Sequence, residues 1–129
     1  MSVTHYGSCH CGAVQFSVEA EEHISADRCN CSICEMSGFL HLITPASRFN
    51  LIQGQDALTD YRFNTRVAKH LFCRHCGVKS FYVPRSNPDG YSVNVNCLDP
   101  KTIKSLKIIE FDGQNWEDNA SRLEHLSKN

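Results

Sequence analysis

The chain contains the segment Phe72-Cys73-Arg74-His75-Cys76-Gly77, in which two cysteines stand three residues apart and a glycine follows the second. Two thiolates at this spacing on a tight turn can both reach one metal ion, and backbone N–H groups of the turn can point at their sulfurs. Glycine after the second cysteine permits the positive φ that such a turn often needs. The flanking stretches are apolar and typical of strands, so the pattern predicts a zinc knuckle at a strand end.

Five of the remaining six cysteines form two more local clusters, and their spacing leaves the division of ligands open. They are Cys9 and Cys11, then Cys29, Cys31 and Cys34, while Cys97 stands alone. A tetrahedral site needs two ligands besides the knuckle, which Cys9 and Cys11 or two of the central trio could supply. Seven cysteines divide into a closed four-thiolate site and a three-thiolate site open to water or substrate, as in catalytic zinc. Eight divide into two closed sites if Cys97 joins.

Composition excludes several classes of protein. The chain has 129 residues, 41% of them hydrophobic, which predicts one folded domain spanning residues 1–129 and argues against disorder. A net charge of −1 disfavours a strongly basic nucleic-acid binder or a polybasic membrane module. No stretch approaches the roughly 18 apolar residues of a transmembrane helix. Residues 1–12 carry no secretory pattern, so we expect the cytoplasm, where cysteines stay reduced or bind metal, and all-sulfur ligation favours zinc.

Hydrophobic alternation predicts a mainly β domain of about eight short, mostly antiparallel strands and few short helices. Residues 13–19 alternate most clearly, with Val14, Phe16 and Val18 on one face. Asp99 followed by Pro100 predicts the start of a short helix, and residues 117–126 could form a terminal one. Further strands are expected at residues 39–44, 49–53, 59–63, 68–72, 79–83, 91–97 and 106–111.

Three other features have more than one interpretation each. His41 shares a strand face with Phe39 and Ile43, either as a donor near the open metal site or as a buried histidine with satisfied hydrogen bonds. Cys97 follows an apolar alternation that favours a core thiol over a pocket-lining thiol or a fourth zinc ligand. Residues 61–88 hold six Lys and Arg and no Asp or Glu before Pro88, which predicts either an anion-binding face or a solvated strand edge.

These motifs resemble those of the glutathione-dependent formaldehyde-activating enzyme family, which also includes centromere protein V-like proteins. The resemblance covers residues 5–117 and rests on three spaced cysteine motifs in order, with two C-terminal segments similar to the centromere protein V-like branch. The matching segments are Gly7-Ser8-Cys9-His10-Cys11-Gly12-Ala13-Val14, Cys29-Asn30-Cys31-Ser32-Ile33-Cys34 and the knuckle, followed by Asn96-Cys97-Leu98-Asp99 and Asp112-Gly113-Gln114-Asn115-Trp116-Glu117.

The resemblance implies a β-tent fold with two zinc ions and assigns their ligands. It implies a structural zinc held by Cys9, Cys11, Cys73 and Cys76, and a second zinc with an open position held by Cys29, Cys31 and Cys34. The implied reaction joins glutathione and formaldehyde reversibly to S-hydroxymethylglutathione, which is a carbon–sulfur lyase step. The leading prediction is therefore a zinc-dependent lyase-like protein acting on a thiol and a small aldehyde. The alternative is a non-catalytic, zinc-stabilised interaction module resembling centromere protein V.

Overall fold

The computed structural model describes residues 2–115 and 119–128. Most of this part of the chain forms strands. One α-helix of six residues lies between the third and fourth strands. The elements are β1 (Ser2–Ser8), β2 (Gln15–Glu21), β3 (His23–Cys29), α1 (Ser32–Ser37), β4 (Leu40–Pro45), β5 (Phe49–Gln53), β6 (Leu58–Tyr61), β7 (His70–Cys73), β8 (Phe81–Tyr82), β9 (Gly90–Asn94) and β10 (Ser105–Phe111).

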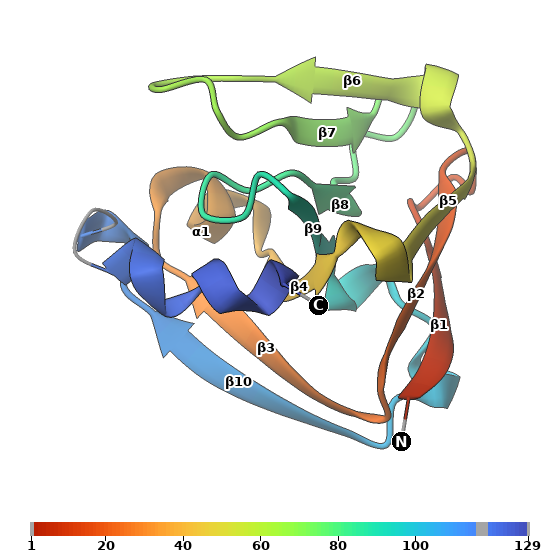
Figure 1. Cartoon of the computed structure of the whole chain (residues 1–129). Coiled ribbons are helices and arrows are strands. Elements are labelled where there is room, and N and C mark those ends of the chain that lie inside the picture. Colours follow the sequence, from red (N-terminus) through yellow and green to blue (C-terminus); the bar gives the residue numbers. More distant parts are fainter. Residues whose placement is uncertain (1, 116–118, 129) are drawn as a thin grey trace.

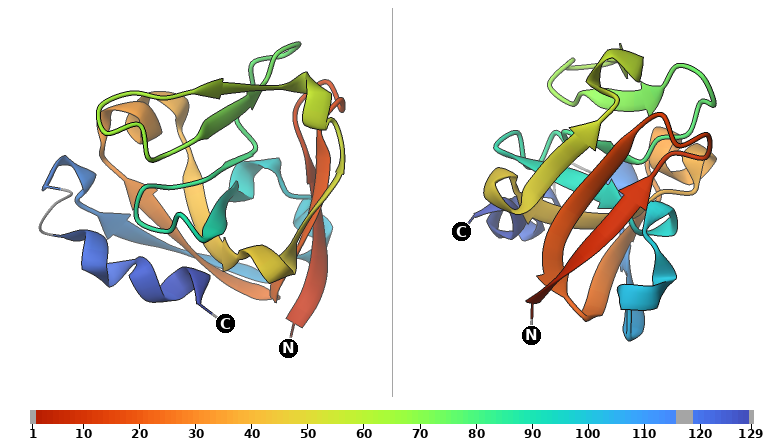
Figure 2. Two further views of the ribbon diagram at one scale, coloured as in Figure 1. Left: turned by 45° about the horizontal axis from the view of Figure 1, so that its top comes forward. Right: turned by 90° about the vertical axis from the view of Figure 1, so that its right-hand side faces the viewer.

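The strands form three sheets that enclose a common interior (Figure 1). A three-stranded sheet has the order β1-β2-β5, a five-stranded sheet the order β10-β3-β4-β9-β8, and β6 pairs with β7. Figure 2 shows the β1–β2 ladder on one side of the molecule and the β6–β7 ribbon above it. The prediction of a mainly β fold with cysteine clusters consistent with zinc knuckles is confirmed.

Aromatic side chains from several strands build the core. The alternation predicted around β2 holds, because Phe16 and Val18 are fully buried. The Phe16 ring stacks on Phe49 at 5.6 Å and meets Phe81 edge-on at 5.5 Å. Gly7 lets the ring lie against the backbone of β1, since a Cβ there would stand 2.4 Å from the ring. The first two sheets are thus held together by apolar burial.

One strand pair departs from the expected antiparallel arrangement. Strand β10 runs parallel to β3, with Ser105 opposite His23 and Phe111 opposite Cys29. The backbone N–H of Lys104 donates to the Glu22 carbonyl at 2.8 Å, so the two strands begin side by side and continue in the same direction. This pairing brings the loop after β10 to the C-terminal end of β3.

One strand boundary differs from the prediction for a local reason. The strand expected over 91–97 ends at Asn94, whose side chain accepts from the Asn96 N–H at 3.1 Å and turns residues 95–97 into a 3-10 helix. The Asp99 cap is confirmed, with its carboxylate accepting from the Lys101 N–H at 3.0 Å.

The C-terminal tail forms 3-10 turns in its described part, at Ala120–Arg122 and Glu124–Ser127. The predicted helix over 117–126 is therefore not continuous, and its first two residues, like Trp116, lie outside the described residues. Asn87 explains the irregularity, because its side-chain amide donates to the Leu123 carbonyl at 2.8 Å and the Glu124 carbonyl at 3.2 Å. No helix in the part of the chain described here is long and apolar enough to cross a membrane.

Candidate functional site

The structure brings Cys9, Cys11, Cys73 and Cys76 together. Their four sulfurs all lie within 4.8 Å of one another. The Cys9–Cys11 and Cys11–Cys73 sulfur–sulfur distances are both 3.7 Å. Sulfurs around a tetrahedral zinc with Zn–S bonds of about 2.3 Å are about 3.8 Å apart, so this group fits that ion closely. The cluster joins the β1–β2 connection to the end of β7 and the turn after it.

Backbone donors surround this four-cysteine group. The Val14 N–H donates to Cys9 Sγ and the His75 N–H to Cys73 Sγ, each at 3.4 Å. Hydrogen bonds from the backbone N–H groups of Cys11 and Val78 lower the pKa of Cys76 to about 6. Gly77 has the positive φ, 77°, that the knuckle pattern predicted. The turn itself therefore favours thiolates, which is the ligand form of cysteine.

A second group consists of Cys29, Cys31 and Cys34, whose sulfurs also lie within 4.8 Å of one another. Cys29 ends β3, Cys31 is the N-cap of α1, and Cys34 is buried within the helix. Hydrogen bonds from the thiols of Cys29 and Cys34 lower the pKa of Cys31, whereas the hydrogen bonds that Cys34 makes with Cys29 and Cys31 raise its own pKa.

The loop after β10 packs directly on this trio. A Cβ at Gly113 would stand 2.2 Å from Cys29 Sγ, so only glycine fits there. The Asn30 side chain fixes the same loop by donating to the Asp112 carboxylate at 3.2 Å and accepting from the Gln114 N–H at 2.9 Å. The parallel β3–β10 pairing thus positions the second wall of the site.

Cys97 belongs to neither group. Among the described residues, the metal-ligating clusters contain four and three cysteines, and no fourth residue joins the trio. Burial, with smaller contributions from the nearby Cys9 and Cys76, raises the pKa of the Cys97 thiol to about 11. The alternative in which Cys97 closes the second site does not fit this arrangement.

The trio opens into a cavity of about 320 Å³, whereas none of the four-cysteine group lines it. The walls come from β3, α1, β4, the segment before β7, the β8–β9 loop and the tail. The lining includes Asp27, Cys29, Cys31, Cys34, His41, Ile43, Phe63, Thr65, His70, Tyr82, Arg85, Phe111, Gly113 and Leu123.

His41 lies on the pocket wall with its imidazole only 5% exposed. Its Nδ1 is 2.9 Å from Ser92 Oγ and 3.3 Å from the Tyr82 hydroxyl. Burial and the nearby Lys79 charge lower the pKa of His41 to about 3, so the ring is neutral at pH 7. The structure thus places His41 where the sequence allowed a donor near the open site.

Lys79 is a partly buried cation behind the same wall. Its ammonium donates to His70 Nδ1 at 2.7 Å and lies 3.8 Å from the centre of the Tyr82 ring. Burial lowers the pKa of Lys79 to about 8, although the Cys34 and Cys31 charges oppose this shift. Of the six basic residues in the 61–88 stretch, Arg85 lines the pocket and the other five do not.

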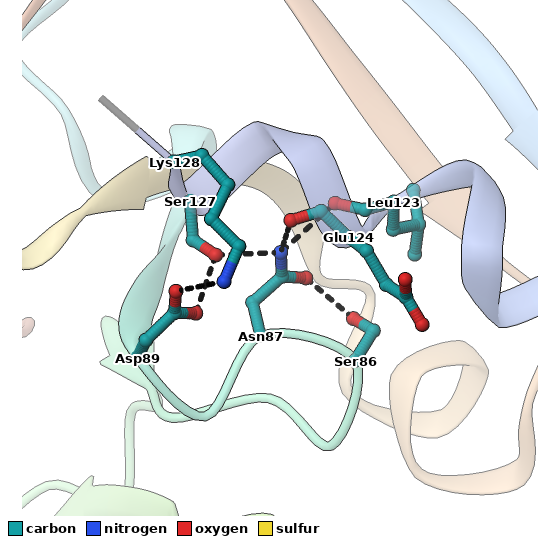
Figure 3. A network of polar contacts seen from close by, with 7 residues as sticks. All are labelled: Ser86, Asn87, Asp89, Leu123, Glu124, Ser127 and Lys128. Atoms are coloured by element: carbon teal, nitrogen blue, oxygen red, sulfur yellow. Dashed lines mark hydrogen bonds and ion pairs between the residues drawn. The ribbon is translucent and has the colours of Figure 1, made fainter.

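The C-terminal tail completes the cavity through Leu123, and a polar network holds it there (Figure 3). Asn87, which is fully buried, also donates to Ser127 Oγ at 2.9 Å. Asp89 accepts from Ser127 Oγ and from the Lys128 ammonium, both at 2.6 Å. The β8–β9 loop thereby fixes the tail across the pocket.

The sequence pointed to the cysteines and His41 but missed His70, Tyr82, Gly113 and Leu123 as pocket residues. His70 and Tyr82 lie in short strand segments that show no motif. From the sequence, Gly113 was named only within the segment similar to the centromere protein V-like branch, although a glycine just after a strand is a signal that a close approach is required.

Comparisons with known proteins agree with this geometry. A family model described as glutathione-dependent formaldehyde-activating enzyme matches residues 4–111. A crystal structure of a Rhodobacter sphaeroides protein is similar, with a TM-score of 0.69 and 39% sequence identity, and the match covers 81% of this chain and 99% of that one. The family match ends at Phe111, so Gly113 and Leu123 contribute to the pocket from beyond it.

Proposed function

The chain belongs to the glutathione-dependent formaldehyde-activating enzyme family, and we propose that it catalyses the reversible addition of a glutathione-like thiol to a small, formaldehyde-like aldehyde. This is a carbon–sulfur lyase reaction. One observation carries the proposal: three clustered cysteines, with no fourth ligand among the described residues, lie on the wall of a cavity large enough for a small adduct. The cytoplasm would supply the reduced thiol.

The donor set of each cysteine group fits zinc. Soft thiolates select zinc over hard cations such as magnesium or calcium, and neither group includes a carboxylate. We propose a structural zinc at Cys9, Cys11, Cys73 and Cys76, and a catalytic one at Cys29, Cys31 and Cys34. Bound there, the second zinc would lower the pKa of a substrate thiol and so supply a thiolate at neutral pH.

The chain's own residues bind and orient the two reactants. Leu123 and Phe111 provide apolar walls that exclude water from the reacting sulfur and carbon. Three thiolates around a dication carry one net negative charge, and the buried Lys79 ammonium balances it from behind the wall. In the forward direction the thiol sulfur bonds to the carbonyl carbon, the C=O π bond breaks, and the oxygen takes up a proton.

The direct test is exchange between glutathione, formaldehyde and S-hydroxymethylglutathione, measured against the uncatalysed rate. Wild type is expected to accelerate exchange, and Cys31→Ser, with the four-cysteine site equally loaded with zinc, should fall to the uncatalysed rate. Cys97→Ser, which changes a cysteine outside both groups, is the matched control and should retain activity. Equal exchange by wild type and Cys31→Ser would show that the trio is not catalytic.

A non-catalytic interaction module is the second candidate function. One observation favours it: β10 carries Leu106, Ile108 and Ile109 with 42%, 40% and 38% of their surfaces exposed. Such an apolar strand at a sheet edge is a typical site for protein contacts. Two inert metals that do not respond to added thiol would favour this candidate over the enzyme.

A further inference from the structure

One nitrogen of the His41 imidazole is unusual among the buried polar atoms of this structure. Among the buried side-chain nitrogen and oxygen atoms of the residues described, Nε2 of His41 has no hydrogen-bond partner. A buried polar atom without a partner costs free energy, and native structures keep few of them. The ring also lines the cavity that contains the cysteine trio. A ligand seated in this cavity would supply the missing partner once the ring and its neighbours admit it.

The surroundings of His41 fix the ring in place. Phe39 packs against it with ring centres 4.5 Å apart, and Tyr82 meets it edge-on at 5.6 Å. Nδ1 faces the hydroxyl groups of Ser92 and Tyr82, and a hydroxyl is able to donate to it. A neutral ring whose Nδ1 accepts must carry its hydrogen on Nε2. With the hydrogen assigned to Nε2 in this way, the atom without a partner is an N–H donor.

A neutral imidazole N–H is suited to an oxygen that gains negative charge. It donates a hydrogen bond without being consumed as an acid, and burial keeps it from ionising at pH 7. The ring and all three cysteines of the trio line the same cavity. A small carbonyl compound held at the trio would therefore share this cavity with the donor.

We propose that the Nε2–H of His41 donates a hydrogen bond to the oxygen of the aldehyde and to the same oxygen in the thiol adduct. The inference rests on the proposed function and assigns the position of the second substrate. As the sulfur–carbon bond forms, the carbonyl π electrons move to this oxygen, which then takes a proton from water, while the proton of the thiol goes to solvent. His41 remains neutral throughout and lowers the barrier by stabilising the developing charge.

Two ligands that differ by one oxygen test this assignment by binding alone. S-hydroxymethylglutathione, kept at equilibrium with formaldehyde, carries the hydroxyl, and S-methylglutathione lacks it. Wild type should bind the first roughly tenfold more tightly, the range for a buried donor gaining its partner. His41→Phe keeps an aromatic ring without a donor, so this preference should disappear. His41→Gln supplies an amide N–H and should restore part of it.

A spectroscopic measurement adds a readout that a structural role would not change. The Nε2–H proton of His41 should shift in NMR spectra on adding S-hydroxymethylglutathione but not on adding S-methylglutathione. His23→Gln is the matched control, because His23 is exposed and its Nδ1 contacts Ser105. This variant should keep the wild-type preference.

The outcomes separate the two proposals. If wild type binds both ligands equally, or His41→Phe keeps the preference, the role of His41 is wrong while the proposed thiol site stands. If neither ligand binds wild type, the glutathione-adduct function fails and the assignment of His41 fails with it. A preference lost in His41→Phe, partly restored in His41→Gln and unchanged in His23→Gln supports the inference.

Discussion

The two cysteine groups offer a metal the same ligand atom, sulfur, but the residues around the two groups differ. The four-cysteine group is enclosed by backbone N–H donors and lies outside the main cavity. The three-cysteine group lies on the cavity wall, beside neutral imidazoles, a tyrosine and a buried ammonium. Surroundings, rather than ligand type, therefore distinguish the proposed structural site from the proposed catalytic one.

The two groups also differ in the lengths of chain that they join. Cys11 and Cys73 are 62 residues apart, so a metal at the first group would link the β1–β2 connection to the turn after β7. The trio lies within six consecutive residues at the end of β3 and in α1, which Figure 1 shows away from β1 and β2. Loss of the first link should affect the whole fold, and loss of the second only its own surroundings.

The largest effect is expected from breaking the four-cysteine group. Structural zinc contributes roughly 10–16 kcal/mol in small domains, which matches or exceeds the roughly 5–15 kcal/mol stability of a typical protein. Cys73→Ser, or removal of metal with a strong chelator, should therefore unfold much of the domain. Circular dichroism with zinc titration measures this, and a fully folded metal-free protein would contradict the structural assignment.

A smaller effect on stability is expected from Lys79, the partly buried cation behind the pocket wall. Burial lowers the pKa of Lys79 from 10.5 to about 8, so between these values the unfolded chain binds the proton and the folded chain does not. Stability should therefore rise with pH across this window, by roughly 3 kcal/mol at most. Denaturant titrations of wild type and Lys79→Met test this, since the variant should lack that part of the rise. Identical pH profiles of the two proteins would mean that folding does not lower the pKa of Lys79.

The C-terminal tail that closes the pocket should contribute less to stability than Lys79 does. Asn87→Ala removes bonds to the Leu123 carbonyl and Ser127 Oγ from a buried side chain, which should lower the free energy of unfolding by about 1–3 kcal/mol. Hydrogen exchange should then increase in the tail but not in β2. Lys128→Ala, which removes only an exposed ion pair with Asp89, is the control and should change stability by about 0–1 kcal/mol. Equal effects of both substitutions would show that Asn87 does not anchor the tail.

The smallest effect on stability is expected from the trio itself. Cys31→Ser removes a half-buried thiol from a local cluster, so the free energy of unfolding should change by about 1 kcal/mol or less at full loading of the first site. Metal analysis should show one ion per chain in place of two. If Cys31→Ser unfolds the protein as Cys73→Ser does, the two groups do not differ as described.

The sequence predicted the pattern-based features of this structure well. Val14, Phe16 and Val18 showed a half-buried strand by alternation, and the knuckle with its positive-φ glycine followed from residue type and spacing. The division of cysteines into groups of four and three depends on contacts across the chain. Spacing left it open, the family resemblance implied it, and the structure shows the sulfurs gathered in that way.

Other features could not be predicted from local patterns. β3 has only two buried apolar side chains, Ile24 and Ala26, and its place depends on β10, 82 residues later. The pocket side chain of Leu123 comes from a segment held by a hydrogen bond to Asn87, 36 residues earlier, and that of His70 contacts Lys79 on the far side of the knuckle. A side chain's role in a cavity is fixed by such partners rather than by its neighbours in sequence.

The difference between the two groups is tested most directly by cobalt-substituted protein titrated with glutathione. Cobalt reports its ligands through its absorption spectrum, and two ions per chain are expected. We predict that one ion changes its spectrum saturably, that Cys31→Ser abolishes the change, and that Cys97→Ser preserves it. A spectrum that does not respond to glutathione, or a response that persists in Cys31→Ser, would contradict the account.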